Sequence, residues 1–96
     1  MILAVHETPT LTRERYEEVI RRLTGGKSRI ESPSDLPFTG LLVHAAGEGP
    51  SGFFIFDVFE SEEAVESFRT ALGSIPEDVG IAEPPKFFPA HTVYVE

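Results

Sequence analysis

The chain has 96 residues and no cysteine, and its 16 acidic residues against 8 basic ones give a formal net charge of -8. This length suits one domain, expected over residues 1–96, and the lack of cysteine excludes disulfides, thiolate metal sites, iron–sulfur clusters and a cysteine nucleophile. The excess of negative charge repels phosphate backbones and anionic lipids, so neither a nucleic acid nor a membrane surface is expected as a partner.

The apolar residues nearest the N-terminus, Ile2 to Val5, lack the length and the basic start of a secretory signal. No stretch of the sequence approaches the roughly 20 apolar residues that a membrane-spanning helix needs. We therefore expect a cytoplasmic protein.

The first two predicted elements are a strand and a helix. The apolar and β-branched residues of Ile2 to His6 predict a strand. From Thr12 to Leu23, apolar side chains recur at i, i+3, i+4 and i+7, which predicts a helix with one apolar stripe: Tyr16, Val19, Ile20 and Leu23. Thr12 suits the N-cap, and Gly25 suits the end of the helix. Lys27 to Thr39 is predicted as an irregular loop whose length suggests a role beyond connection.

A hairpin and a second helix follow. Gly40 to Ala46 and Phe53 to Phe59 are apolar runs that predict two strands, and the glycine-rich segment between them is typical of a turn. Ser61 is placed to cap a helix that Gly73 ends, and the apolar stripe of this helix is Ala64 or Val65, Phe68 and Leu72.

The remaining residues predict a loop and an edge strand. The loop runs from Pro76 to Lys86, and the strand runs from about Phe87 to Val95. Pro89 removes a hydrogen-bond donor from this strand, which is therefore expected at a sheet edge or with a bulge. The whole order, β-α-β-β-α-β, predicts an α+β, ferredoxin-like fold with an antiparallel sheet and two helices on one of its faces.

The strands contain too few polar residues for a sheet with one solvated face, since a half-buried antiparallel strand alternates apolar and polar residues. Phe53 to Phe59 contains one polar residue, Leu41 to Ala46 contains one, and Ile2 to Val5 contains none. Two helices cover only one face, so the other needs a second cover. We predict a homodimer in which two copies pack sheet face to sheet face. The alternative is a monomer whose two long loops fold over the sheet.

A family resemblance runs through five segments of the chain: Val5–Pro9, Leu11–Tyr16, Leu42–Gly47, Asp57–Ala64 with Phe68, and Phe88–His91. Together they resemble the dimeric α/β-barrel superfamily and, within it, small proteins similar to antibiotic-biosynthesis-monooxygenase (ABM) domains. The resemblance implies a dimeric α/β barrel with a ligand cavity between the helices and the sheet or inside the barrel. The superfamily holds cofactor-free monooxygenases, haem-using enzymes and isomerases, so the resemblance implies no single catalytic set.

Three histidines are the first candidates for chemistry. His6 ends the first predicted strand, His44 lies within the second, and His91 lies within the last, all flanked by apolar residues. An imidazole in such a position can act as an acid or base or can bind a polar ligand. Buried histidines bonded to the backbone are the simpler interpretation. A metal site is the third interpretation, although no H-x-H or H-x-x-x-H spacing supports it.

Asp57 is the one charged residue in the most apolar strand. A carboxylate there needs a partner. Paired with His6 or His44 it would orient an imidazole, whereas a bond to Arg69 or to the backbone would be structural.

Aromatic residues are the candidates for ligand binding. Tyr16 can point its phenol at a cavity or belong to the core, and the expected cavity walls favour an apolar or aromatic small molecule: Phe54, Phe56 and Phe68. The expected function is that of an enzyme similar to cofactor-independent ABM-type monooxygenases, with no cofactor, a histidine base and Asp57 as its orienter. The alternative is a non-catalytic homodimer that binds a ligand or is associated with stress.

Overall fold

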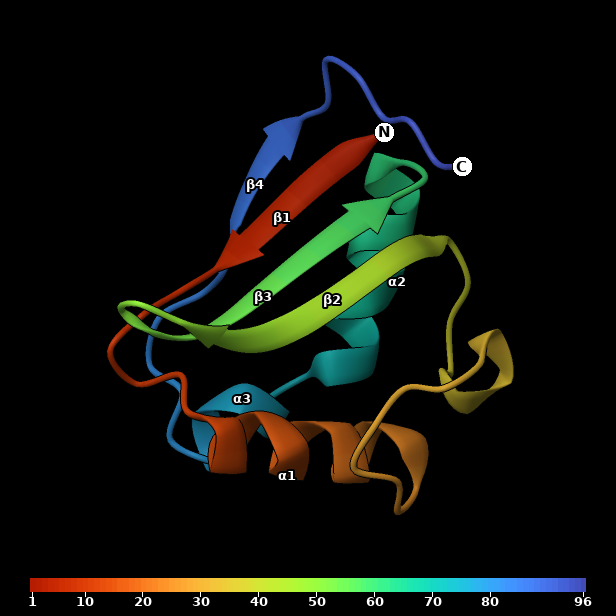
Figure 1. The fold of residues 1–96 in the computed structure, drawn as a ribbon. Coiled ribbons are helices and arrows are strands. Elements are labelled where there is room, and N and C mark those ends of the chain that lie inside the picture. Colours follow the sequence, from red (N-terminus) through yellow and green to blue (C-terminus); the bar gives the residue numbers. More distant parts are fainter.

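The computed structural model describes residues 1–96 and contains one four-stranded antiparallel sheet (Figure 1). Its strands are β1 (Ile2–His6), β2 (Leu41–Gly49), β3 (Gly52–Phe59) and β4 (Lys86–Pro89), in the order β2-β3-β1-β4. The α-helices are α1 (Arg13–Thr24), α2 (Glu62–Leu72) and the short α3 (Ile75–Asp78), and a 3₁₀ helix, η1 (Pro33–Asp35), lies between α1 and β2. This α+β architecture is compatible with the predicted ferredoxin-like fold. None of the helices has both the length and the apolar character required to cross a membrane.

Both long helices begin and end at the residues that the sequence indicates. Thr12 caps α1 by accepting a hydrogen bond from the backbone N–H of Arg15, and Ser61 caps α2 by accepting one from Ala64. Gly25 follows α1 with φ 78°, a left-handed conformation that glycine adopts without steric strain. Local capping therefore sets the bounds of the two helices.

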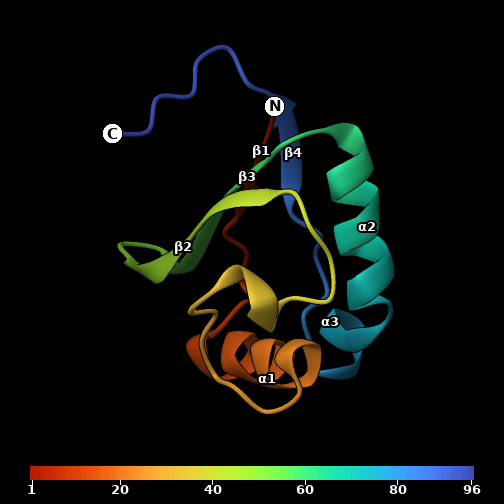
Figure 2. The ribbon, with the colours of Figure 1, turned by 90° about the vertical axis from the view of Figure 1, so that its right-hand side faces the viewer.

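The helices lie on one face of the sheet. Strand register places Ala4 opposite Asp57, so both side chains project from the same face. On this face Ala4 and Phe59 pack against α2, while Phe53 belongs to a second cluster that includes Val19 of α1. Figure 2 shows α2 running beside the strands and α1 crossing below them.

The hairpin and the second loop differ from the prediction. Strand β2 continues to Gly49, which pairs with Gly52, so the turn consists of two residues and not the whole glycine-rich segment. Helix α3 begins one residue before the predicted loop of Pro76 to Lys86 and includes its first three residues, and its Ile75 packs against the second core cluster. Tertiary contacts thus order both segments beyond what their composition indicates.

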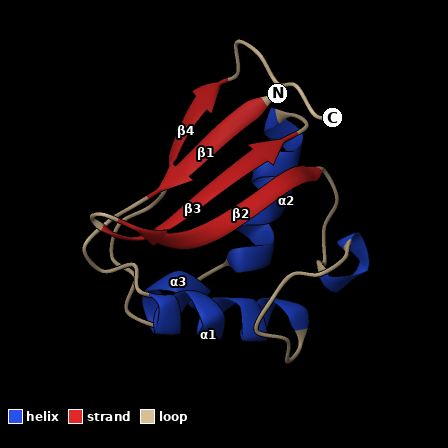
Figure 3. Ribbon diagram, viewed as in Figure 1, coloured by secondary structure: helices blue, strands red, loops and turns tan.

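The prediction of a last strand reaching Val95 is wrong, because β4 ends at Pro89 (Figure 3). Its only partner is β1, and Ile2, where β1 begins, already lies opposite Pro89. One further hydrogen bond joins the N–H of Ala90 to the carbonyl of Met1. The residues after Ala90 belong to no strand, and Tyr94 is 85% exposed.

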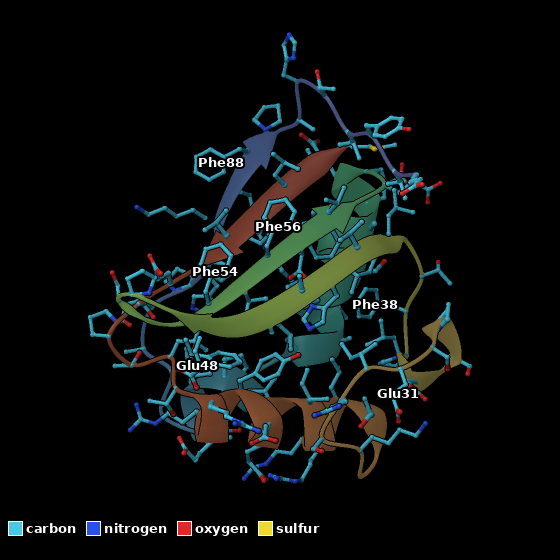
Figure 4. The ribbon with its side chains drawn as sticks, in the orientation of Figure 1. Glu31, Phe38, Glu48, Phe54, Phe56 and Phe88 are labelled. Carbon is cyan, nitrogen blue, oxygen red and sulfur yellow. The ribbon has the colours of Figure 1, made fainter.

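The opposite face of the sheet is apolar and has no helix over it. Phe54 and Phe56 project from it, as Figure 4 shows, and the register adds apolar neighbours from the other strands: Leu3, Val5, Val43, Ala45 and Phe88. The two long loops do not cover this face. Their apolar residues, among them Leu36 and Ile81, line a cavity on the helix side instead. Within one chain neither a helix nor a long loop covers this surface, here called the open face.

Candidate functional site

A cavity of about 340 Å³ lies between the helix side of the sheet, the two long helices and the loops. Its walls are mainly apolar and include residues from both long helices and the first loop: Val19, Leu23, Ile30, Phe38, Phe68 and Leu72. Six polar side chains line the same space: His6, Tyr16, His44, Asp57, Glu77 and Glu83. An apolar cavity with a few converging polar groups is typical of a small-molecule site.

Three of these residues form a continuous hydrogen-bonded chain, here called the relay. The Tyr16 hydroxyl lies 2.5 Å from His44 Nε2, and His44 Nδ1 lies 2.6 Å from Asp57 Oδ1. They come from α1, β2 and β3, and the register that places His44 opposite Asp57 makes them cross-strand neighbours. The Tyr16 ring is also stacked on the imidazole, with an interplanar angle of 13°. The buried Asp57 is thus paired with His44, and neither with His6 nor with Arg69.

The proton positions in the relay follow from the chemistry of its two ends. A carboxylate only accepts hydrogen bonds, so His44 Nδ1 donates to Asp57. Burial, followed by the negative charges of Asp57 and Glu17, raises the pKa of Tyr16 to about 12, so the phenol keeps its proton at neutral pH. In the neutral form of the His44 imidazole, Nε2 has no proton and accepts this one. The Tyr16 oxygen keeps a lone pair for a group in the cavity.

This arrangement predicts a late titration of Tyr16. In a Tyr94→Phe variant, which leaves Tyr16 as the only phenol, we expect phenolate absorbance to appear with a pKa of about 12 and not 10.0. Because the unfolded chain ionises first, the stability that the protonated phenol contributes is lost as the pH rises from 10.0 to about 12. Ultraviolet absorbance and circular dichroism, recorded together against pH, test this. A folded protein whose phenol ionises at 10.0 would contradict the buried relay.

His6 lines the cavity without joining the relay. Its Nε2 lies 2.8 Å from the backbone carbonyl oxygen of Glu83, which can only accept, so Nε2 carries a proton. Burial lowers the pKa of His6, although the Glu83 carbonyl and the charges of Glu83 and Asp57 oppose the effect. The ring is therefore neutral near pH 7. No group of three or more His, Asp and Glu side chains is arranged to hold a metal ion.

Three of the predicted site residues lie outside this cavity, while Phe68 is part of its wall. Phe54 and Phe56 alternate along β3 with the cavity-facing residues Ile55 and Asp57, so they project from the open face (Figure 4). The prediction that His91 lies within a strand is wrong. It follows the end of β4, is exposed, and hydrogen-bonds the neighbouring Thr92.

The sequence analysis did not identify the loop residues that close the cavity. Leu36 and Phe38 belong to the first loop, and Ile81 belongs to the second. The length of the first loop was the available signal, since long loops in small domains often have a function. The Glu83 carbonyl that holds His6 could not be identified in this way, because any residue type supplies a backbone carbonyl.

Comparisons with known proteins return no match. No protein-family model matches the chain, and neither does any curated protein or solved structure. The resemblance of the sequence to ABM-like proteins stays a prediction, and the geometry of the cavity is the basis for inferring function.

Proposed function

We propose that this protein is an enzyme that removes a proton from a small, apolar, hydroxyl-bearing or enolisable substrate in the cavity. The single observation that carries the proposal is the unbroken relay from Tyr16 through His44 to the buried Asp57. A buried carboxylate that orients an imidazole, which in turn contacts a hydroxyl, is an arrangement suited to proton transfer. The apolar walls suit a substrate with little charge of its own.

Proton transfer would proceed along the relay. The substrate hydroxyl gives its proton to the Tyr16 oxygen while the Tyr16 proton passes to His44 Nε2. The resulting imidazolium is stabilised by the Asp57 carboxylate at 2.6 Å. The bound substrate becomes an anion in a mainly apolar space, where it is less hydrated and more reactive than in water.

The resemblance to ABM-like proteins favours molecular oxygen as the co-substrate, with no bound cofactor. For an enolisable substrate with a CH₂ group, the anion transfers electrons to oxygen and a carbon–oxygen bond forms. Loss of the second C–H proton with cleavage of the O–O bond leaves a carbonyl group. One oxygen atom enters the product and the other leaves as water, so the substrate itself supplies all the electrons.

Anthrone, an apolar ketone whose enol is a phenol, provides a test. We expect the protein to accelerate oxygen uptake and anthraquinone formation and, without oxygen, to accelerate deuterium exchange at the CH₂ group. Deuterium exchange without oxidation would support the proposed proton transfer and exclude the reaction with oxygen. Binding of anthrone with neither reaction would favour the alternative, a non-catalytic ligand-binding protein.

We also propose that the protein is a homodimer formed through the open face. The supporting observations are its apolar residues, among them the half-exposed Phe88 at 46%, and the position of both long loops on the other side of the sheet. A patch of this kind on a soluble monomer is a liability for aggregation. A second copy supplies a surface of matching shape and chemistry through a two-fold axis.

A charge placed on the open face tests the dimer. In Phe56→Glu, like charges from two copies meet at the interface, at a cost of several kcal/mol, or about 100-fold or more in the dissociation constant. We expect wild-type protein to sediment at twice the 10.6 kDa of one chain and the variant to sediment as one chain. Thr70→Glu, at an exposed position of α2, adds the same charge elsewhere and should remain a dimer. A monomeric wild type would exclude the proposal.

A further inference from the structure

His6 has a hydrogen-bond acceptor that no residue uses. Its Nε2 proton is donated to the Glu83 carbonyl, and a neutral imidazole has only one N–H, so Nδ1 carries a lone pair. No hydrogen bond of the protein involves Nδ1, and the side chain lines the cavity. His44 differs, because Asp57 and Tyr16 occupy both of its nitrogens.

The surrounding contacts hold His6 in this tautomer. The Glu83 carboxylate accepts a hydrogen bond of 2.6 Å from the Thr10 hydroxyl, and that hydroxyl accepts one of 2.9 Å from the N–H of Ala82. These bonds tie the segment that carries the Glu83 carbonyl to the residues after β1. The Nε2 proton therefore keeps its partner, and Nδ1 stays an acceptor.

The two histidines of the cavity lie on different strands. His6 is on β1 opposite Ile55, and His44 is on β2 opposite Asp57, with β3 between the two histidines. Strands about 4.8 Å apart and residues about 3.4 Å apart along a strand place the two histidine Cα atoms roughly 12 Å from each other. His6 takes no part in the relay, so its Nδ1 is an acceptor separate from the Tyr16 oxygen at which the relay ends.

The charges around the cavity have one sign. No lysine or arginine lines it, whereas Asp57, Glu77 and Glu83 do. An anionic ligand would lose hydration there without gaining a cationic partner, and it would be repelled by these carboxylates. A ligand without charge meets neither penalty.

We propose, building on the proposed function, that the substrate is an uncharged molecule with two hydrogen-bond donors, one at each end. One donor meets the Tyr16 oxygen and the other meets His6 Nδ1. Analogues in which a carboxylate replaces one of the donors are excluded. In this proposal His6 is a binding residue that sets specificity, whereas the relay performs the proton transfer.

Three biphenyl ligands test the proposal in calorimetric titrations of the wild-type protein. They are para,para′-biphenol, para-phenylphenol with one hydroxyl, and the biphenyl with one hydroxyl and one carboxylate at its para positions. A hydrogen bond to an otherwise unused acceptor increases affinity by about tenfold. We therefore expect biphenol to bind about tenfold more tightly than phenylphenol, and the carboxylate to bind more weakly than either.

His6→Leu should remove the tenfold advantage of biphenol over phenylphenol, whereas His91→Leu, at an exposed histidine outside the cavity, should preserve it. A second measurement needs no variant: biphenol, unlike phenylphenol, should shift the nitrogen resonance of His6 Nδ1 in labelled wild-type protein.

Equal affinities of the two phenols, or tighter binding of the carboxylate, would overturn the inference. If anthrone still reacts in that case, the proposed function survives. If biphenol binds more tightly than phenylphenol but anthrone does not react, the result supports the two-donor inference and contradicts the proposal that the protein is an enzyme.

Discussion

Replacing His44 with glutamine should lower the rates of anthrone oxidation and of anaerobic deuterium exchange by about 10²–10⁴-fold, the usual contribution of a general base. The glutamine amide can still hydrogen-bond Tyr16 and Asp57, but it cannot take up the proton that the relay delivers to Nε2. Initial rates under air and under nitrogen, measured at equal concentrations of folded protein, give the two values. Anthrone affinity should change little, because the apolar walls are intact.

Matched variants separate the relay from general effects of substitution. His91→Gln makes the same change at an exposed histidine and should leave both rates unchanged. Tyr16→Phe, which keeps the ring against Phe53 at a centroid distance of 5.0 Å, should lower the rates as His44→Gln does, because it removes the end of the relay that meets the substrate. Wild-type rates in His44→Gln would exclude this histidine as the proton acceptor.

Replacing Phe59 with alanine should lower the free energy of unfolding by about 3–5 kcal/mol, the range for a buried phenylalanine. Phe59 has no exposed surface, and its ring lies 5.1 Å from that of Phe68 and 6.4 Å from that of Phe87. The free energy of unfolding of a typical domain is about 5–15 kcal/mol, so this loss is a large fraction of the total stability. Urea titrations followed by circular dichroism measure it.

Two comparisons control this result. Tyr94→Ala, at an 85% exposed side chain, should change the free energy of unfolding by about 0.5 kcal/mol or less. Phe59 does not line the cavity, so folded Phe59→Ala protein should bind phenylphenol as wild type does. A loss below about 1 kcal/mol would indicate that Phe59 is not well packed in the core.

Local pattern was sufficient for the order of elements and the ends of both long helices. Thr12 and Ser61 cap their helices because each side-chain oxygen reaches a backbone N–H only three residues away. The nearly continuous apolar character of β3 likewise predicted that both sheet faces would be apolar. Such features depend on residues that are close in sequence, so they can be predicted from the sequence alone.

Local pattern could not predict which side chains meet in the cavity. Asp57 had four candidate partners, and the choice of His44 follows from the register of β2 against β3, which the two-residue turn sets. A shift of one residue would move His44 to the open face. His91 lies outside the cavity because the pairing of β4 with β1 ends at Pro89, two residues before it. Pairing between strands is a long-range property, and so is the relay that depends on it.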